Sequence, residues 1–505
     1  MKRSLLVLGA LALLAACGGK GASRPGPPPA RSAAISDAGA VAPDPLGPRP
    51  ELAEAAPFTP PIPIQYKRPN GTEVWLLERH GLPIVSMQLV VPAGAAYDPD
   101  GKGGLAATTA NMLDEGAGKR GPLDLAREAD RLGATLRTGA LADYGFVQLT
   151  VLKKNLGPAS DIFGDVVTKP QLKPVEFKRV HDLWENSLRA RQSEPEAVAG
   201  VVVARKVYSA SHPYAHPIDG TLGSAAKVTL DDVKKFYATR WRPDHARLVV
   251  VGDVTRAEVD AMLDRVFGTW KAPTVPAPVD LLVPPAPLSG RGEPPPVARR
   301  VVVVDRPDAP QSVIAVARPG VSAFDEESAI LPRVNSALGG SFTSRLNQDL
   351  REEHGWSYGA HSRFSFTRMR GMFVAQAAVH TEHTGEALQA MIADIGVMSK
   401  AGLTDEEVEK TKQLARAELV ETFETVQAAA ARLGRNAGVG HTPDHEAAAS
   451  RLMVRADKGQ LKKAAAQSLD LDTAVIVIVG PRAKIEPQLK AIGITAVESS
   501  GTEGQ

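Results

Sequence analysis

Apolar residues along the chain occur in short runs bounded by turn residues, and longer stretches between these runs have the spacing of amphipathic helices. Two apolar runs flank the turn Arg79-His80-Gly81, and two more flank a turn near Pro307 to Ala309. Leu248 to Val251 and Ala474 to Val479 are apolar runs that each lie between two stretches of helical spacing. We therefore expect strands at all these runs, and helices on either side of the last two.

This order of elements occurs twice along the chain, which predicts two homologous half-domains. Both halves begin with strands and end with a helix, a strand and a helix. Long amphipathic helices fill the middle of each half, for example Asp405 to Leu433. Because strands and helices are mixed within each half, we expect the α+β class, with helices packed on one mostly antiparallel sheet in each half.

Two stretches of low complexity set the domain boundaries. Residues 18–61 are dense in proline, glycine, alanine and serine, which cannot build a core and therefore predict a disordered tether. The proline-rich residues 272–296 predict a semi-rigid linker. The half-domains then extend over residues 62–271 and 297–495, and each has an ordinary domain size. We expect a disordered tail at residues 496–505.

The composition is that of a globular protein, with 43% hydrophobic and 23% charged residues, and 505 residues are enough for more than one core. The net charge is +2, from 59 basic and 57 acidic residues, and no block of like charge stands out. Nucleic acid is therefore not an expected partner. Beyond the N-terminal segment there is no run of about 18 apolar residues, so we expect no transmembrane helix.

Residues 1–17 predict a signal peptide that ends in a lipidated cysteine. Two basic residues precede the apolar stretch Leu5 to Leu14, which is too short to span a bilayer. Cys17, the only cysteine, ends the sequence LAAC, which resembles a bacterial lipoprotein box with cleavage before Cys17 and lipid attached to it. Gly18 follows in place of aspartate, which by resemblance to bacterial sorting rules indicates the periplasmic face of the outer membrane. The alternative is a chance cysteine in an ordinary signal peptide.

The segment Gly104 to Gly116, GLAATTANMLDEG, has the frame of an active-site helix without its reactive side chains. It resembles the active-site segment of the pitrilysin/insulinase family of zinc metallopeptidases, which reads roughly G-L-A-H-x-x-E-H-M-L. In that family both histidines bind zinc and the glutamate holds the attacking water. The same register places Ala107 and Asn111 at the histidines and Ala110 at the glutamate. The resemblance therefore implies that this half binds no metal in the family's way.

The family's third zinc ligand is a glutamate on a later helix, which corresponds here to EFKRVHDLWENSLRARQSEP. Counting back from Pro195 places Ser187 at the ligand position, and Glu185 lies two residues away on another face of the helix. All three ligands and the base are therefore replaced. Methyl groups cannot hold zinc and a single asparagine is a poor ligand for it.

The second half carries the family's other signature. Gly339 to Phe364 resembles the segment S-R-L-x-x-x-L-R-E-x-x-G-L-x-Y, whose arginine and tyrosine bind the substrate backbone and polarise the scissile carbonyl. The resemblance gives these roles to Arg351 and Tyr358. Guanidinium and phenol groups are hydrogen-bond donors suited to stabilising charge on a carbonyl oxygen. The structural alternative is an ordinary helix that ends at Gly355, with Arg351 in a surface ion pair.

Two pairs of histidines have short spacings. His212 and His216 are four residues apart, but the proline after each one excludes a helix, so we expect a turn-forming structural loop. His380 and His383 lie beside a glutamate and could form half of a metal site. The favoured interpretation of this second pair is a polar strand end that leads into a helix.

Together these features predict the zinc-free subunit of a two-chain, clamp-shaped endopeptidase. In two-component members of the family one chain carries the zinc motif and the other the arginine–tyrosine pair, and this chain has the second pattern. Zinc is then expected in a homologous partner with H-x-x-E-H, and the substrate is a peptide or unfolded protein. The alternative is a catalytically inert scaffold or peptide-binding protein, which a neighbouring coding sequence with H-x-x-E-H would argue against. Autonomous catalysis at a metal site of His380 and His383 is a third hypothesis.

Overall fold

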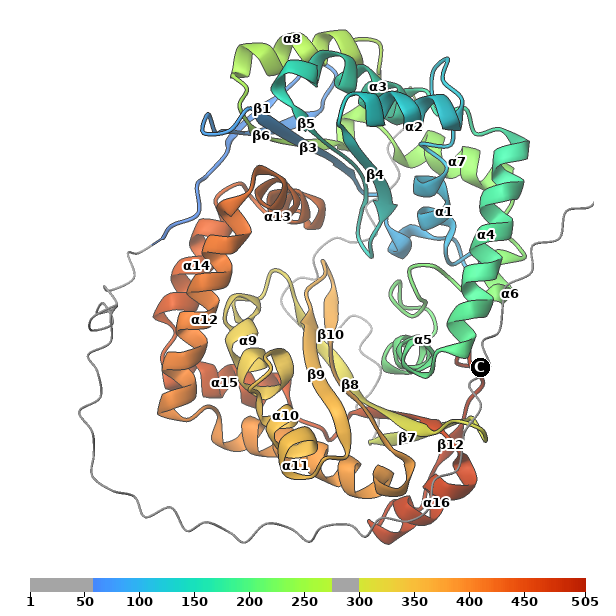
Figure 1. Cartoon of the computed structure of the whole chain (residues 1–505), viewed down its shortest axis with the longest axis vertical. Helices are drawn as coiled ribbons and strands as arrows, with labels where there is room; N and C mark the ends of the chain where they lie inside the picture. Colours follow the sequence, from blue (N-terminus) through green and yellow to red (C-terminus); the bar gives the residue numbers. More distant parts are fainter. Residues whose placement is uncertain (1–57, 275–298) are drawn as a thin grey trace, which may run out of the picture. The chain divides into compact units, whose positions relative to one another are not determined.

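The computed structural model describes residues 58–274 and 299–505 (Figure 1). Cys17, the predicted signal peptide and most of the predicted tether and linker lie outside these residues. Within the two described ranges, no helix is both long and apolar enough to cross a membrane.

The first half, residues 58–274, contains a six-stranded sheet in the order β1-β2-β6-β3-β5-β4. Its strands are β1 (Ile64–Lys67), β2 (Glu73–Glu78), β3 (Ile84–Val91), β4 (Thr135–Ala140), β5 (Gly145–Leu152) and β6 (Arg247–Gly252). All neighbours are antiparallel except β2 and β6. The turn Arg79-His80-Gly81 therefore does not close a hairpin, because β6 lies between β2 and β3.

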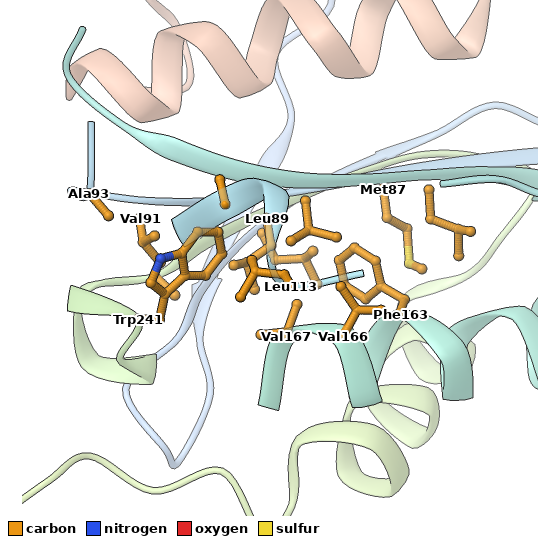
Figure 2. Packing of buried hydrophobic residues seen from close by; sticks show 14 of the residues in the cluster. Met87, Leu89, Val91, Ala93, Leu113, Phe163, Val166, Val167 and Trp241 are labelled. Carbon is orange, nitrogen blue, oxygen red and sulfur yellow. The ribbon is translucent and has the colours of Figure 1, made fainter. Parts of the chain in front are cut away.

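Helices α1, α3, α7 and α8 cover one face of this sheet (Figure 1). The helices of the half are α1 (Leu105–Asn111), α2 (Pro122–Arg131), α3 (Leu156–Thr168), α4 (Pro174–Ser193), α5 (Pro195–Val207), α6 (Leu222–Ala225), α7 (Leu230–Arg240) and α8 (Arg256–Phe267). Met87, Leu89 and Val91 alternate along β3 and point into the core, where they meet Phe163 and Val167 of α3 (Figure 2).

The second half, residues 299–505, contains a six-stranded sheet in the order β12-β7-β11-β8-β10-β9. Its strands are β7 (Arg300–Asp305), β8 (Gln311–Ser322), β9 (Ser357–Ser365), β10 (Arg370–His380), β11 (Val475–Gly480) and β12 (Glu498–Ser499). β11 lies between β7 and β8 just as β6 lies between β2 and β3, and both inserted strands are parallel to the strand before the turn. The α+β class and the repeated plan of two mostly antiparallel sheets are thus confirmed.

Most helices of the second half pack on its sheet and on one another (Figure 1). They are α9 (Glu327–Asn335), α10 (Arg345–Asn347), α11 (Thr384–Ala401), α12 (Asp405–Glu424), α13 (Val426–Val439), α14 (His445–Arg455), α15 (Lys458–Ser468) and α16 (Arg482–Ala491), with π-helical segments η4 (Ser336–Gly340) and η5 (Gln348–Glu353).

The single helix expected over Asp405 to Leu433 is wrong, because the chain breaks at Thr425 into α12 and α13. Thr425 has extended backbone angles, and its hydroxyl oxygen accepts a hydrogen bond from the backbone N–H of Ala428 at 3.1 Å. A threonine side chain is a favourable cap for a helix start, so this residue ends one helix and begins the next.

The two halves exchange helices across their sheets. α13 from the second half packs on β3 and β6, where Leu433 joins the buried cluster around Trp75 and Val249. α5 from the first half packs on β8 and β11, where Val202 joins the cluster around Val477. Each sheet is therefore covered on one face by its own half and on the other by a helix of the opposite half (Figure 1).

The C-terminal tail is ordered, in contrast to the disorder expected for residues 496–505. β12 extends the second sheet by pairing with β7. Beyond β12, a carboxylate oxygen of Glu503 accepts hydrogen bonds from the backbone N–H of Leu222 at 2.7 Å and from the amide of Gln192 at 3.1 Å. The backbone N–H of Leu222, at the start of α6, has no partner within the helix, so it binds this carboxylate and holds the tail in place. The composition of the tail does not reveal such a contact with a distant segment.

Candidate functional site

The degenerate active-site helix α1 is held in place at its N-terminus. Gly104 precedes the helix at φ +96°, and a Cβ atom there would overlap the indole of Trp184 and lie 2.8 Å from the carbonyl oxygen of Asp219, so the position needs glycine. The Asp98 carboxylate accepts hydrogen bonds from the backbone N–H groups of Gly104 and Ala106, both at 2.7 Å. Burial raises the pKa of Asp98 to about 7, although these bonds act in the opposite direction.

The four positions that match zinc ligands and base contain no strong metal ligand. Ala110 is fully buried and Ala107 is 8% exposed, so both methyl groups pack in the core. Asn111 and Ser187 are exposed, and the Ser187 hydroxyl donates a hydrogen bond to the carbonyl oxygen of Trp184 at 2.7 Å. Within residues 58–274 and 299–505, no group of three histidine, cysteine, aspartate or glutamate side chains is arranged to hold a metal ion.

Aromatic side chains of α4 fill the space beside α1. Trp184 packs against Gly104 and donates a hydrogen bond from its indole nitrogen to the carbonyl oxygen of Asp219 at 2.8 Å. His181 meets the Trp184 ring edge-on at 5.5 Å between ring centres, and its Nε2 lies 3.0 Å from the carbonyl oxygen of Ala225. Sequence reasoning missed Trp184, although it lies one helical turn before Ser187. α1 therefore has a packing role here.

The segment that carries Arg351 and Tyr358 is anchored on its inner side. Leu346 and Leu350 are fully buried. Arg345 forms a two-pronged ion pair with Glu407 of α12, at 2.8 Å from Nε to Oε1 and 2.6 Å from Nη2 to Oε2. The Asn347 side chain accepts a hydrogen bond from the backbone N–H of Ala360 in β9 at 2.9 Å. These contacts fix η5 and the start of β9 relative to one another.

On its outer side this segment presents two hydrogen-bond donors. The Arg351 guanidinium lies over the ring of Phe342, 4.5 Å from its centre, and its Nε is 3.3 Å from a carboxylate oxygen of the adjacent Glu352. The Tyr358 side chain is 83% exposed, and its hydroxyl has no hydrogen-bond partner in the part of the chain that the structure describes. Arg351 lies on a π-helical segment, a conformation often found at functional sites.

Histidine and tryptophan rings form a stacked surface beside Tyr358. Trp356 lies between His354 and His383, at 4.0 Å and 5.4 Å between ring centres. His380 is 6.5 Å from the Tyr358 ring. β10 ends at His380 and α11 begins at Thr384, so the favoured interpretation, a polar strand end that leads into a helix, is confirmed.

The loop around His212 and His216 is structural, as expected. His212 stacks on Tyr208 at 4.4 Å, and burial lowers the pKa of His212 to about 4. The Tyr214 hydroxyl donates a hydrogen bond to buried Asp143, whose other carboxylate oxygen accepts the backbone N–H of Arg368 at 3.0 Å. The loop thus ties the first half to the β9–β10 hairpin of the second.

The fold and these two sites define a metallopeptidase-like protein whose first half has no zinc ligands at the expected positions. Residues 74–218 match the model of "Insulinase (Peptidase family M16)", and residues 227–414 match that of "Peptidase M16 inactive domain". The two matches span both halves. The chain belongs to peptidase family M16, the insulinase/pitrilysin family.

Two relatives agree with this assignment, and a solved structure shares the fold. The uncharacterized zinc protease YmxG of Bacillus subtilis is 19% identical over 74% of this chain and 87% of its own length. The probable inactive metalloprotease YmfF of the same organism is 21% identical over 62% of this chain and 71% of its own length. The crystal structure of a peptidase M16 inactive domain from Pseudomonas fluorescens superposes with a TM-score of 0.74 at 24% identity, over 83% of this chain and 98% of that one, and shares the fold.

Proposed function

We propose that this chain is the zinc-free subunit of a two-chain M16 endopeptidase, in which Arg351 and Tyr358 bind the substrate carbonyl at the zinc site of a homologous partner. The observation that carries the proposal is the outward presentation of both donors from a segment whose inner side is anchored. Arg351 also contacts the adjacent Glu352 through Nε, whereas the exposed Tyr358 hydroxyl has no hydrogen-bond partner among the described residues and can reach a substrate.

The chemistry of the two side chains fits this role. A guanidinium stays charged at every physiological pH, and stacking on the Phe342 ring leaves the two Nη groups at its edge available for a substrate, while Nε contacts Glu352. Together with the phenol of Tyr358, it would stabilise the negative charge that develops on the carbonyl oxygen when water attacks. The zinc, the base and the water would come from the partner, because Ala107, Ala110 and Asn111 supply none of them.

The test is coexpression with a homologue that carries intact H-x-x-E-H, followed by an assay of cleavage of an unstructured peptide. We expect Arg351→Ala and Tyr358→Phe each to lower kcat by about 10²–10³, the usual loss for one oxyanion donor. Gel filtration should show an unchanged complex, because both side chains lie on the surface. Arg363→Ala, on an exposed position of β9, is the matched control and should retain activity.

Full activity of the Arg351→Ala complex would overturn this proposal in favour of the second candidate, a catalytically inert scaffold or peptide-binding protein. The contact of Arg351 Nε with the Glu352 carboxylate at 3.3 Å favours this second candidate, because a surface ion pair is the structural alternative to a catalytic role for Arg351. Activity of the complex that depends on the presence of this chain, but not on its two donors, would identify the scaffold.

We also propose that Cys17 anchors the mature chain by lipid to the periplasmic face of the outer membrane. The support is the sequence LAAC before a glycine, which resembles a lipoprotein box. Labelled palmitate should be incorporated into the wild-type protein and recovered in the outer-membrane fraction. Cys17→Ser should lose the label, and a labelled Cys17→Ser protein would contradict the assignment.

A further inference from the structure

A cavity of about 190 Å³ opens in the second half, where residues of α9, α12, α13 and α14 line it. Neither Arg351 nor Tyr358 lines it, so it is separate from the site described above. Its apolar wall comes from several elements and includes Phe366, Leu419, Val439 and Met453. This volume lies below the roughly 300 Å³ at which pockets for drug-sized ligands begin, so the cavity suits a smaller ligand such as one compact amino-acid residue.

One polar wall of the cavity is a fixed ion pair. Glu446 of α14 is 3% exposed, and one of its carboxylate oxygens accepts hydrogen bonds from Nε of Arg432 and from the side-chain amide of Asn436, both at 2.8 Å. Burial opposes ionisation of Glu446, but the bond from Arg432 holds its pKa below the usual range. Glu446 therefore neutralises Arg432 and fixes α14 to α13.

Arg435 lies one turn further along α13 and lines the same cavity. Its side chain is exposed, and among the described residues it has no hydrogen bond or ion pair. The other carboxylate of the lining, Glu418 on α12, acts on Arg432 and contributes to the raised pKa of that guanidinium. Within residues 58–274 and 299–505, Arg435 is thus a cation without an ion-pair partner at the edge of the cavity, although its charge also acts on the buried Tyr144.

Two stacked histidines complete the lining without adding charge. The rings of His441 and His445 lie parallel, 3.5 Å apart between centres. Burial lowers the pKa of His441 to about 3 and also lowers the pKa of His445. Both rings are therefore neutral at physiological pH, and they offer a flat surface with nitrogen atoms for hydrogen bonds.

We propose that this cavity binds the carboxylate of a compact apolar amino-acid residue, with the carboxylate on Arg435 and the side chain against Leu419 and Met453. Arginine binds a carboxylate through two parallel hydrogen bonds, which sets the orientation of the ligand. A pocket with mostly apolar walls and a few fixed polar groups is the usual form of a small-ligand site. The same chemistry occurs in a free N-acyl amino acid and in the C-terminal residue of a peptide.

The experiment measures calorimetric binding of four probes to the mature full chain. These are N-acetyl-leucine, N-acetyl-leucinamide, a pentapeptide ending in leucine, and the same pentapeptide with a C-terminal amide. We expect at least one carboxylate probe to bind about ten- to a hundred-fold more tightly than its amide, as a charge-assisted hydrogen bond requires. Tight binding of the pentapeptide alone would identify peptide C-termini as the ligand, whereas comparable binding of N-acetyl-leucine would identify the small molecule.

Two variants locate the site. Arg435→Gln keeps a polar side chain at an exposed position, so it should fold normally and lose the preference for carboxylate over amide. Arg455→Gln, at an exposed position of α14 outside the cavity lining, is the matched control and should bind as the wild type does. The proposal is overturned if each carboxylate probe binds no better than its amide, or if Arg435→Gln binds as tightly as the wild type.

Discussion

Substitution of Gly438 on α13 tests how closely this helix approaches the sheet of the other half. A Cβ atom at Gly438 would overlap the ring of Tyr144, which is 4% exposed and has little room to move. Glycine within a helix is normally worse than alanine by about 0.5–1 kcal/mol, so helix propensity alone predicts that Gly438→Ala is stabilising. Overpacking of a closed core costs about 1–3 kcal/mol. We therefore expect a net loss of roughly 1–2 kcal/mol.

Two further glycines provide a graded comparison. At Gly434 a Cβ atom would lie 2.5 Å from the amide end of Gln88, a side chain that can rotate, so Gly434→Ala should cost less than Gly438→Ala. Gly396 on α11 has no atom within 4 Å of its Cβ position, and Gly396→Ala should stabilise by up to about 1 kcal/mol. Urea unfolding followed by circular dichroism gives the three values. If Gly438→Ala is as stable as Gly396→Ala, α13 does not pack on Tyr144 as described.

Three other changes have defined outcomes. Glu446→Gln should lower the free energy of unfolding by roughly 1–3 kcal/mol at pH 7. The pKa of Glu446 is depressed in the folded state, so the wild-type protein loses this stabilisation as the carboxyl is protonated. The difference in stability between variant and wild type should therefore shrink below about pH 4. Burial depresses the pKa of His212 to about 4, so the wild-type protein loses stability as the pH falls from the usual histidine pKa towards 4. His212→Phe should therefore lose less stability than the wild type between pH 7 and pH 5, as measured by urea titration. Glu503→Ala should lower the free energy of unfolding by about 1 kcal/mol, because the hydrogen bond from the backbone N–H of Leu222 is lost. The variant's C-terminal tail should also be trimmed faster by carboxypeptidase. Unchanged trimming would contradict the anchoring role of Glu503.

The pattern of apolar residues predicted where the strands lie along the chain, but it did not predict which strands pair in the sheet. The apolar run Leu248 to Val251 became β6, which extends from Arg247 to Gly252. Its insertion between β2 and β3 could not be predicted, because alternation of side chains defines the faces of a strand but not its pairing partner. The break at Thr425 was missed for a related reason. The apolar spacing continues through it, and only the capping hydrogen bond marks the new helix.

The sequence predicted which residues form the candidate site, but it did not predict the side chains that surround them. The family motif identified Arg351 and Tyr358, and their role in catalysis remains a prediction. The stacking of Arg351 on Phe342 and the filling of the α1 region by Trp184 depend on how separate segments meet in space. Sequence spacing carries no signal for such contacts. Likewise, Arg432, Arg435 and Glu446 form one cavity only because α13 and α14 lie side by side.

The exchange of α5 and α13 means that neither half can complete its core alone. The face of the first sheet that contains Trp75 and Val249 is covered by α13, which begins at Val426, far along the chain from the end of β6 at Gly252. The face of the second sheet that contains Val477 is covered in the same way by α5. A first half cut off before α13 would therefore expose an apolar sheet face, and exposed apolar surface of this kind promotes aggregation.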